Sequence, residues 1–183
     1  MAAYRLDVRS ILEEIGGGIH VSDTLDLDEL VVGDERFVMV SPPAFDVTVS
    51  NAGEAFVSIG TVTAHVRATC SRCLCEFETD ITGDVEGLWL GPGDTAPEGE
   101  DVSGEVDSEG RIDLEPAVVA ALVVEAPFAP LHDESCAGLC LTCGADLNVE
   151  SCHCGEEPDA EHPFAALKGL LGEDEEGRQE PES

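Results

Sequence analysis

Basic residues are scarce in this chain of 183 residues, in which eight lysines and arginines stand against 40 aspartates and glutamates. The formal net charge is −32. Such a surface repels a phosphate backbone, because proteins bind nucleic acids mainly through Lys and Arg. The charge therefore disfavours direct RNA contact and docking on anionic lipid. It favours a basic partner, although halophily or solubility would explain the same composition.

Long apolar segments are also missing. No stretch has the length of uncharged apolar residues that spans a membrane. The first residues, Met1 to Asp7, lack the apolar region of a signal peptide. We therefore predict a cytoplasmic protein with no membrane partner. Structural disulfides are rare in that reducing compartment, so the eight cysteines indicate metal binding instead.

Catalytic signatures are absent as well. The chain contains no G-x-S-x-G, P-loop or G-x-G-x-x-G motif, and its many carboxylates follow no pairing rule. We therefore predict that it is not an enzyme and takes no small-molecule substrate. Aromatic residues make up only 4% of the chain, so the core must rest on Val, Leu, Ile and Ala.

Alternation of apolar and polar residues predicts β-structure in the first two thirds of the chain. Residues 45–49 alternate, a turn follows at 51–53, and residues 62–70 alternate again with Cys70 on the apolar face. A tight turn at 71–74 then leads into a second alternating run from Cys75 to Trp89. This pattern predicts an antiparallel hairpin with one buried face, and it places Cys75 in the core.

One helix is expected after the hairpin. Asp113 is the expected N-cap, Pro116 lies in the first turn, and residues 117–124 are almost wholly apolar. A helix this apolar must be buried, so we expect it to pack on the sheet, although its valines leave a strand open. The predicted fold class is α+β, with an antiparallel β-sheet (possibly barrel-like), a packed apolar helix and a C-terminal Cys-rich zinc knuckle.

Composition divides the chain into three parts. Residues 1–130 are expected to form the α+β domain, with a flexible acidic loop at 91–110. Residues 131–171 are expected to hold the zinc knuckle and a short amphipathic helix that opens at Pro163. Residues 172–183 form a charge run that we predict to be a disordered acidic tail.

Metal-ligand spacing is clearest near the C-terminus, in the run Cys140-x-x-Cys143, eight residues, and then Cys152-x-Cys154. Zinc takes four soft donors in a tetrahedron, and a C-x-x-C turn presents two thiolates on one side of the ion. Gly144 allows the backbone to fold back after the turn. The spacing and the compartment favour zinc over disulfides at these four cysteines. His153, between two of them, is expected to point outward.

A second set of donors is more dispersed. Cys70 and Cys73 lie at the predicted hairpin turn, while His132 and Cys136 follow the predicted helix. Together they would form a Cys3His site in which one ion clamps distant parts of the chain. Alternatively, Cys70 is a small core residue and Cys73 a free thiol. The sequence thus predicts one or two zinc ions.

Several segments in fixed order make the chain similar to a known family. They are Cys70-Ser71-Arg72-Cys73 with Phe77; Gly110-Arg111-Ile112-Asp113-Leu114; Ala126-Pro127 with Leu131-His132-Asp133 and Cys136; residues 138–148; Cys152-His153-Cys154; and residues 163–170. The chain resembles the YceD family of large ribosomal RNA subunit accumulation proteins. It departs from the family pattern at Leu141, where Pro is frequent, and at His162, where Asp is common.

The resemblance implies a non-enzymatic role in the accumulation of 23S rRNA and in large ribosomal subunit biogenesis. Some family members lack the C-terminal knuckle but keep the hairpin cysteines, which implies that Cys70, Cys73 and Cys136 act as a separate unit. The resemblance and the acidic net charge together point to a basic ribosomal protein or a pre-ribosomal particle as partner. Two alternatives stay open: direct rRNA binding through the knuckle, aided by Arg67, Arg72 and Arg111, and a thiol oxidoreductase that uses Cys70 and Cys73.

Overall fold

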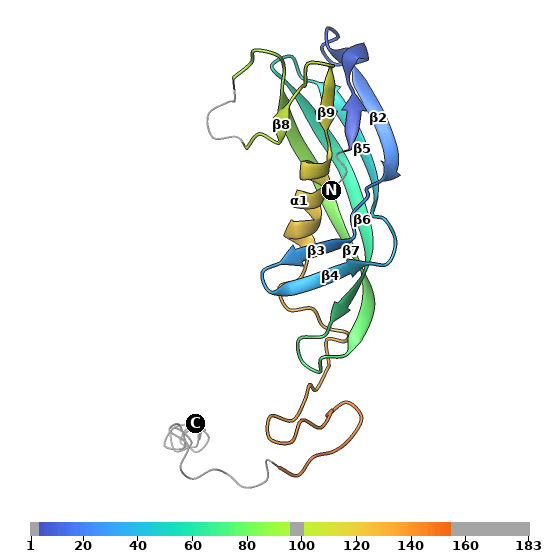
Figure 1. The fold of residues 1–183 in the computed structure, drawn as a ribbon, viewed down its shortest axis with the longest axis vertical. Helices are drawn as coiled ribbons and strands as arrows, with labels where there is room; N and C mark the ends of the chain where they lie inside the picture. The colour runs from blue at the N-terminus through green and yellow to red at the C-terminus, as the bar shows by residue number, and fades with distance from the viewer. Residues whose placement is uncertain (1–3, 96–100, 155–183) are drawn as a thin grey trace, which may run out of the picture. The chain divides into compact units, whose positions relative to one another are not determined.

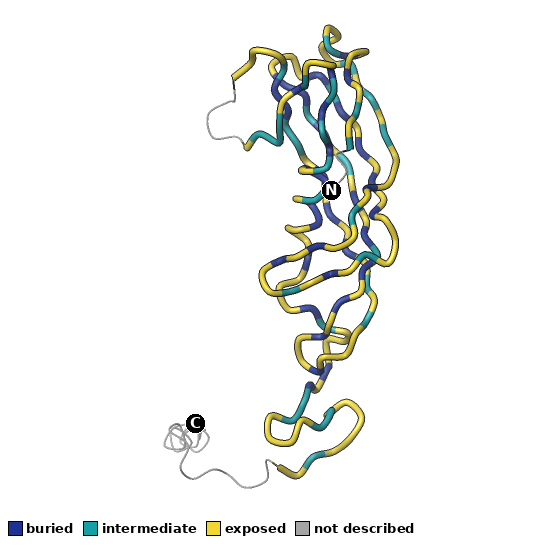
Figure 2. Tube along the Cα trace, viewed as in Figure 1, coloured by how far each residue is buried: buried dark blue, intermediate teal, exposed yellow. Residues whose placement is uncertain are grey.

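The computed structural model describes residues 4–95 and 101–154. Its chain divides into two compact units, Met1–Cys136 and Ala137–Ser183. The first unit is a sheet with one helix, and the described part of the second unit is a short irregular segment (Figure 1). Buried positions concentrate on the strands and the helix of the first unit, whereas residues 139–154 are exposed or half-buried (Figure 2).

Antiparallel pairing dominates the first unit. Its elements in chain order are β1 (Arg5–Asp7), the 3-10 helix η1 (Arg9–Ile11), β2 (Gly18–Thr24), β3 (Glu29–Val32), β4 (Glu35–Met39), β5 (Ala44–Asn51), β6 (Ala55–Thr69), β7 (Glu76–Leu90), β8 (Gly104–Glu105), β9 (Arg111–Asp113) and α1 (Glu115–Glu125). The main sheet has the order β2-β5-β6-β4-β3, and β7 pairs with β6 and β8. Strands β1 and β9 form a separate two-stranded sheet. The predicted α+β class is therefore confirmed at the level of an antiparallel sheet with one helix.

The longest feature of the sheet is the hairpin of β6 and β7. The two strands pair without interruption from Ala55↔Leu90 to Thr69↔Glu76. Apolar residues at every second position of β6, from Val62 to Ala68, are buried as the alternation predicts. Because the register continues to the end of both strands, Cys70 and Cys73 lie at the tip of the hairpin.

The described strands do not close into a barrel, so the barrel-like possibility is wrong. Strand β7 occupies one edge of β6, and β5 and β4 share the other edge at different heights. The outer strands of this order, β2 and β3, do not pair with each other within the described residues. A closed barrel requires that strands from the two sides of β6 pair with each other, and neither β7 nor β8 pairs with β2 or β3 within the described residues.

Helix α1 forms where the sequence predicts it, and the strand alternative is wrong. Its N-cap is Leu114 rather than Asp113, although an Asp113 carboxylate oxygen accepts a hydrogen bond from the Glu115 amide at 3.1 Å. The helix packs on β7 (Figure 1). A Cβ atom on Gly83 of β7 would lie 2.5 Å from the Ala121 carbonyl oxygen, so glycine is what permits this close packing.

The segment predicted to be an acidic loop contains short ordered parts. Strand β8 pairs in parallel with β7, and Val106 after it is buried. Residues 96–100 lie outside the described residues, as do the predicted helix from Pro163 and the tail at 172–183. The flexibility of the loop and the three-part division of the chain stay predictions. No helix of the described residues is long and apolar enough to cross a membrane, and the cytoplasmic location stays a prediction.

Candidate metal centres

The first group of metal-ligand residues lies at the tip of the β6–β7 hairpin, and we call it the hairpin cluster. It consists of Cys70, Cys73, His132 and Cys136, all within the first unit. Cys70 follows the last residue of β6, and Cys73 lies in the turn before β7. His132 and Cys136 come from the irregular segment after α1, which returns to the hairpin tip.

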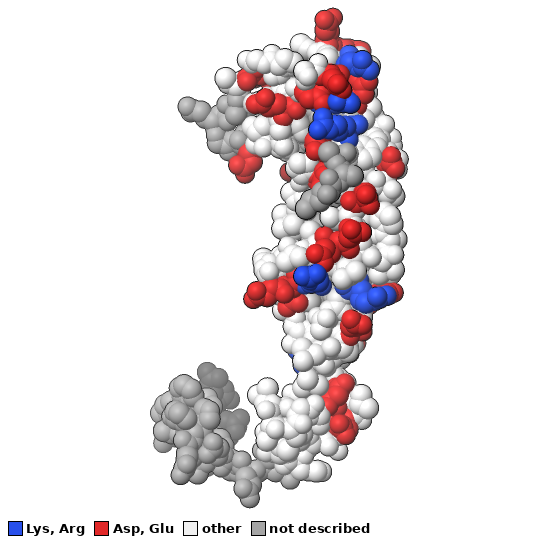
Figure 3. Space-filling model, in the orientation of Figure 1, with Lys and Arg blue, Asp and Glu red and all other residues white. Residues whose placement is uncertain are grey.

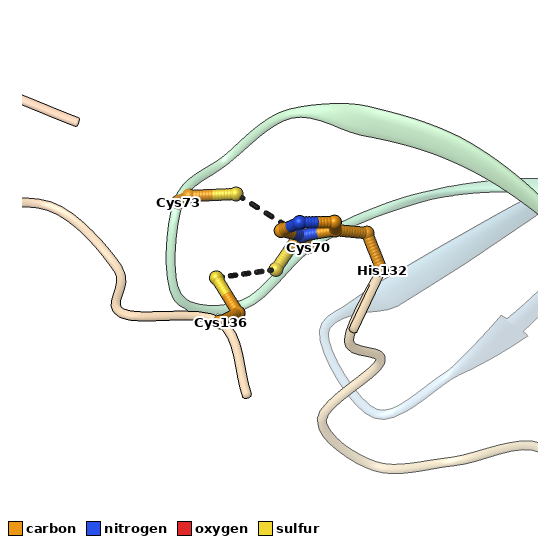
Figure 4. A group of neighbouring side chains, drawn as sticks. All are labelled: Cys70, Cys73, His132 and Cys136. Atoms are coloured by element: carbon orange, nitrogen blue, oxygen red, sulfur yellow. Dashed lines mark hydrogen bonds between the residues drawn. The ribbon is translucent and has the colours of Figure 1, made fainter. Parts of the chain in front are cut away.

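The four side chains of the hairpin cluster point toward one another (Figure 4). All four ligand atoms lie within 4.8 Å of one another. The sulfurs of Cys70 and Cys136 are 3.8 Å apart, and the sulfur of Cys73 is 3.4 Å from Nδ1 of His132. Sulfurs on a tetrahedral zinc ion with ordinary Zn–S bonds are separated by about 3.8 Å. The cluster therefore has the dimensions of a metal tetrahedron.

Hydrogen bonds bring the returning segment to the hairpin. The Ser71 amide donates to the Pro130 carbonyl at 2.8 Å. The Arg72 guanidinium donates through Nη1 to the carbonyl oxygens of Glu134 and Cys136, at 3.1 and 2.9 Å. Sequence reasoning missed this role of Arg72, since nothing in the sequence indicates which carbonyls an arginine in a turn will meet.

Burial separates the three cysteines of this cluster, but not its histidine, from solvent. The three cysteines are buried, whereas His132 is exposed. Burial raises the pKa of Cys70, but this is outweighed by hydrogen bonds from the Cys73 amide, the His132 side chain and amide, and the Arg72 amide. The pKa of Cys70 is therefore lowered to about 5. A buried thiolate held by donors of the chain is a preformed ligand for a cation.

Cys75 is exposed, so its predicted place in the core is wrong. The backbone of Leu74 is left-handed, with a φ of 62°, and β7 begins only at Glu76. The alternation of the strand therefore does not extend back to Cys75. Its sulfur lies 3.2 Å from that of Cys73, at the margin of the hairpin cluster.

The second group, which we call the knuckle cluster, lies in the second unit and consists of Cys140, Cys143, Cys152 and Cys154. A short antiparallel bridge joins Leu139 to Asp146 around the first two cysteines. The Cys140 amide donates to the Ala145 carbonyl, and the Gly144 amide donates to the Cys140 carbonyl, both at 2.8 Å. Gly144 has a φ of 75°, a conformation that glycine adopts without strain.

The sulfurs of the knuckle cluster are crowded. All four lie within 4.8 Å of one another, and that of Cys152 is 3.3 Å from Cys140 and 3.4 Å from Cys143. The amides of Cys143 and Thr142 lower the pKa of Cys140 to about 6. The Cys154 amide lowers the pKa of Cys152, but the neighbouring sulfurs of Cys140, Cys154 and Cys143 prevail and raise it to about 12. The first thiolate forms easily and the next does not, unless a cation offsets their repulsion.

Both clusters bring together the residues that the sequence proposes as ligands. The hairpin cluster offers three sulfurs and one imidazole, and the knuckle cluster offers four sulfurs. All eight cysteines lie in the described part of the chain, and none of them forms a disulfide there. Each cluster could hold a metal ion, and soft donors in a tetrahedron suit zinc. That zinc is the metal, and that these residues bind it, stay predictions.

A family model matches residues 59–171, and its description is large ribosomal RNA subunit accumulation protein YceD. The matched span contains both clusters and the whole of α1.

Uncharacterised mycobacterial proteins are similar over part of the chain. One from Mycobacterium leprae is 35% identical over 115 residues, which is 62% of this chain and 52% of that protein. One from Mycobacterium tuberculosis strain H37Rv is 33% identical over 129 residues, or 69% of this chain and 61% of that protein. The matches thus span about half to three fifths of these relatives. No solved structure matches the chain.

Proposed function

The chain belongs to the YceD family, and on that premise we propose that it is a non-enzymatic, zinc-binding factor in 23S rRNA accumulation and large ribosomal subunit biogenesis. It acts through a basic ribosomal protein, whose charge it neutralises until that protein meets rRNA. The zinc ions hold the ligand segments in place and take no part in a reaction. The family description supports the link to ribosomal RNA, and the charge and the two clusters support the rest.

The observation that supports a basic partner is that the arginines of the described residues already have partners within the chain. Every arginine in the described residues is already engaged within the chain. Five form ion pairs with carboxylates: Arg5, Arg9, Arg36, Arg67 and Arg111. The sixth, Arg72, donates to backbone carbonyls. On the face drawn in Figure 3, most of the visible basic side chains lie beside acidic ones, and further acidic side chains stand apart from any basic one.

This surplus of carboxylates favours a basic protein over RNA. Direct rRNA binding would depend on Arg67, Arg72 and Arg111 as a basic patch. Arg67 instead pairs with Glu78 at 2.8 Å, and Arg111 pairs with Asp107 at 3.2 Å. To bind phosphate, these arginines would have to exchange partners that they already have, which reduces the net gain.

The geometry also favours a structural metal over a redox dithiol. Reactive C-x-x-C pairs lie at helix N-termini, where the thiolate is exposed to its substrate. Cys70 and Cys73 are buried in a β-hairpin turn, together with Cys136. A closed set of buried donors is typical of structural zinc sites.

The test is a binding assay with separated components. The zinc-loaded full chain is immobilised and offered either stripped 23S rRNA or the mixed proteins of the large subunit. We expect it to retain one or a few basic proteins and no stripped rRNA. Retention of stripped rRNA alone would overturn the basic partner. Metal analysis with thiol counting completes the test, because protein without stoichiometric zinc and with a reversible Cys70–Cys73 disulfide would be an oxidoreductase.

A further inference from the structure

Helix α1 has no polar face. Its inward residues, Ala117, Val118, Ala121 and Leu122, are buried against the core. Its outward residues are also apolar: Pro116, Ala120, Val123 and Val124 are exposed, and Val124 is 78% exposed. These four positions follow the helical repeat and form one stripe. A helix that is apolar all round is normally covered on both faces.

A groove runs along this stripe, between α1 and β7. One hollow of about 680 Å³ lies between residues 86–88 of β7, residues 101–103 and the start of α1. A second hollow of about 330 Å³ lies between Asp84 and Glu86 of β7 and the later part of α1. The two hollows share Glu86, Ala117 and Ala120, so they form one continuous surface, which we call the α1–β7 groove.

The lining of the groove includes a buried serine hydroxyl that lacks a hydrogen-bond partner within the described residues. The Ser58 side chain is fully buried, and its hydroxyl oxygen has no hydrogen-bond partner within the described residues. Gly87 lies against it, since a Cβ on Gly87 would be 2.9 Å from the Ser58 hydroxyl. Buried hydroxyls are normally satisfied, so the lining of the groove contains a hydrogen-bonding group without a partner in the described residues.

The edge of β7 beside the groove also lacks a strand. On residues 76–88 the pairing partner of β7 is β6 alone, and β8 joins only at Trp89 and Leu90. At Leu88 the far edge already bonds Ser103, through the Leu88 carbonyl at 2.8 Å and the Leu88 amide at 3.2 Å. Alternate amides and carbonyls on the far edge of residues 76–86 find no strand partner within the described residues. Such an edge accepts an added strand from another molecule.

The rim of the groove is acidic and uncompensated. Asp84, Glu86, Asp101 and Glu125 line it. None of them belongs to an ion pair within the described residues. A second copy of this chain would bring carboxylates against carboxylates. The chain's own segments at 96–100 and 155–183 are acidic too, so charge disfavours them as occupants.

We propose that the α1–β7 groove binds an extended basic segment of a partner protein, added as a strand to the free edge of β7. Side chains of such a strand alternate. One set faces the apolar stripe of α1, and the other lies beside Asp84 and Glu86. The segment recognised therefore alternates apolar residues with Lys or Arg. This deepens the proposed function by naming the surface and the sequence pattern that the basic partner presents.

The test uses the zinc-loaded full chain and a labelled peptide of alternating lysine and valine. We expect saturable binding, and weaker binding of a peptide of the same composition with its lysines and valines in separate blocks.

The double variant Asp84→Lys/Glu86→Lys should bind the alternating peptide about tenfold more weakly, because two attractive contacts become repulsive. The matched control is Glu13→Lys/Glu14→Lys, which changes the charge equally at exposed positions outside the groove. An equal loss in the control would mean general attraction to an acidic surface and would overturn the proposal.

Two further readouts locate the segment. Val124→Ser should weaken peptide binding about fivefold without changing stability, because Val124 is exposed in the free chain. Amide hydrogen exchange should slow on peptide addition at alternate residues of 76–86. If those amides are already protected in the free chain, another segment or a second copy covers the edge, and the proposal fails.

The same variants separate this proposal from the function it rests on. If the wild-type chain and Asp84→Lys/Glu86→Lys retain the same basic ribosomal protein equally well, the groove is wrong and the proposed function stands. If the wild-type chain retains no ribosomal protein but the peptide titration behaves as expected, the groove stands and the ribosomal partner is wrong.

Discussion

The hairpin cluster and the knuckle cluster begin with the same local device and end as different sites. In both, amides of a C-x-x-C turn help to lower the pKa of its first cysteine, to about 5 for Cys70, where His132 also donates, and to about 6 for Cys140. The three cysteines of the hairpin cluster are buried, and the cluster joins Cys70 to Cys136, which lie 66 positions apart. The knuckle cluster is exposed or half-buried, and Cys140 and Cys152 lie 12 positions apart. The turn thus favours the thiolate form of its first cysteine. The segments that surround the turn decide which parts of the chain a metal ion would hold together.

The largest difference should appear in stability. Cys136→Ser removes a buried ligand that ties the segment after α1 to the sheet. We expect it to lower the free energy of unfolding of the zinc-loaded first unit by about 3 kcal/mol. Denaturant unfolding followed by the fluorescence of Trp89, the chain's only tryptophan, measures this. The matched Cys154→Ser in the knuckle cluster should change that transition by less than about 0.5 kcal/mol. Equal losses would mean that the two sites support one cooperative structure.

Thiol reactivity should differ next. In metal-free protein, pH 7 lies above the lowered pKa of Cys140, about 6, so this cysteine is mostly thiolate. The same pH lies far below the raised pKa of Cys152, about 12, so that cysteine is almost wholly protonated. Both are half-buried, so iodoacetamide should alkylate Cys140 about a hundredfold faster. Cys70 is also ionised at that pH, but it is buried and should stay unmodified until the first unit unfolds. Mass spectrometry of quenched samples measures all three, and early labelling of Cys70 would contradict its burial.

Metal release should follow exposure. We expect a chromophoric chelator to remove zinc in two phases, with the exposed knuckle cluster releasing its ion about tenfold faster. Cys154→Ser should abolish the fast phase, and Cys136→Ser should abolish the slow one. Cys75→Ser is the control: since Cys75 lies outside the four-residue group, it should leave both phases and the metal content unchanged. Loss of one equivalent of zinc in this variant would make Cys75 a ligand.

The smallest expected effect concerns Arg72. Arg72→Ala removes the hydrogen bonds to the carbonyls of Glu134 and Cys136, and it should lower the stability of the first unit by about 1 kcal/mol. It should also speed the slow phase of zinc release and leave the fast phase unchanged. Arg36→Ala is matched in chemistry but removes only an exposed ion pair with Glu29, so it should have almost no effect. If the two variants lower stability equally, Arg72 does not stabilise the hairpin cluster.

Much of the candidate sites could be predicted because spacing alone carries the information. A C-x-x-C turn has one local geometry, so Cys140 and Cys143 are recognisable without a fold. The assignment of Cys75 to the core is wrong because it extends the period of β7 to a residue that lies outside the strand, between the left-handed Leu74 and the strand start at Glu76. The role of Arg72 could not be found from the sequence, because its acceptors come from a segment more than 60 positions away.

The sequence by itself determined the two C-x-x-C turns, the long hairpin, the apolar helix and the excess of carboxylates. Each of these depends on residues close together in the chain or on composition. Only the tertiary structure decided that the sheet stays open, that His132 and Cys136 meet Cys70 and Cys73, and that an apolar face of α1 lies exposed beside a free strand edge. These outcomes depend on contacts between distant segments, and local patterns constrain such contacts only weakly.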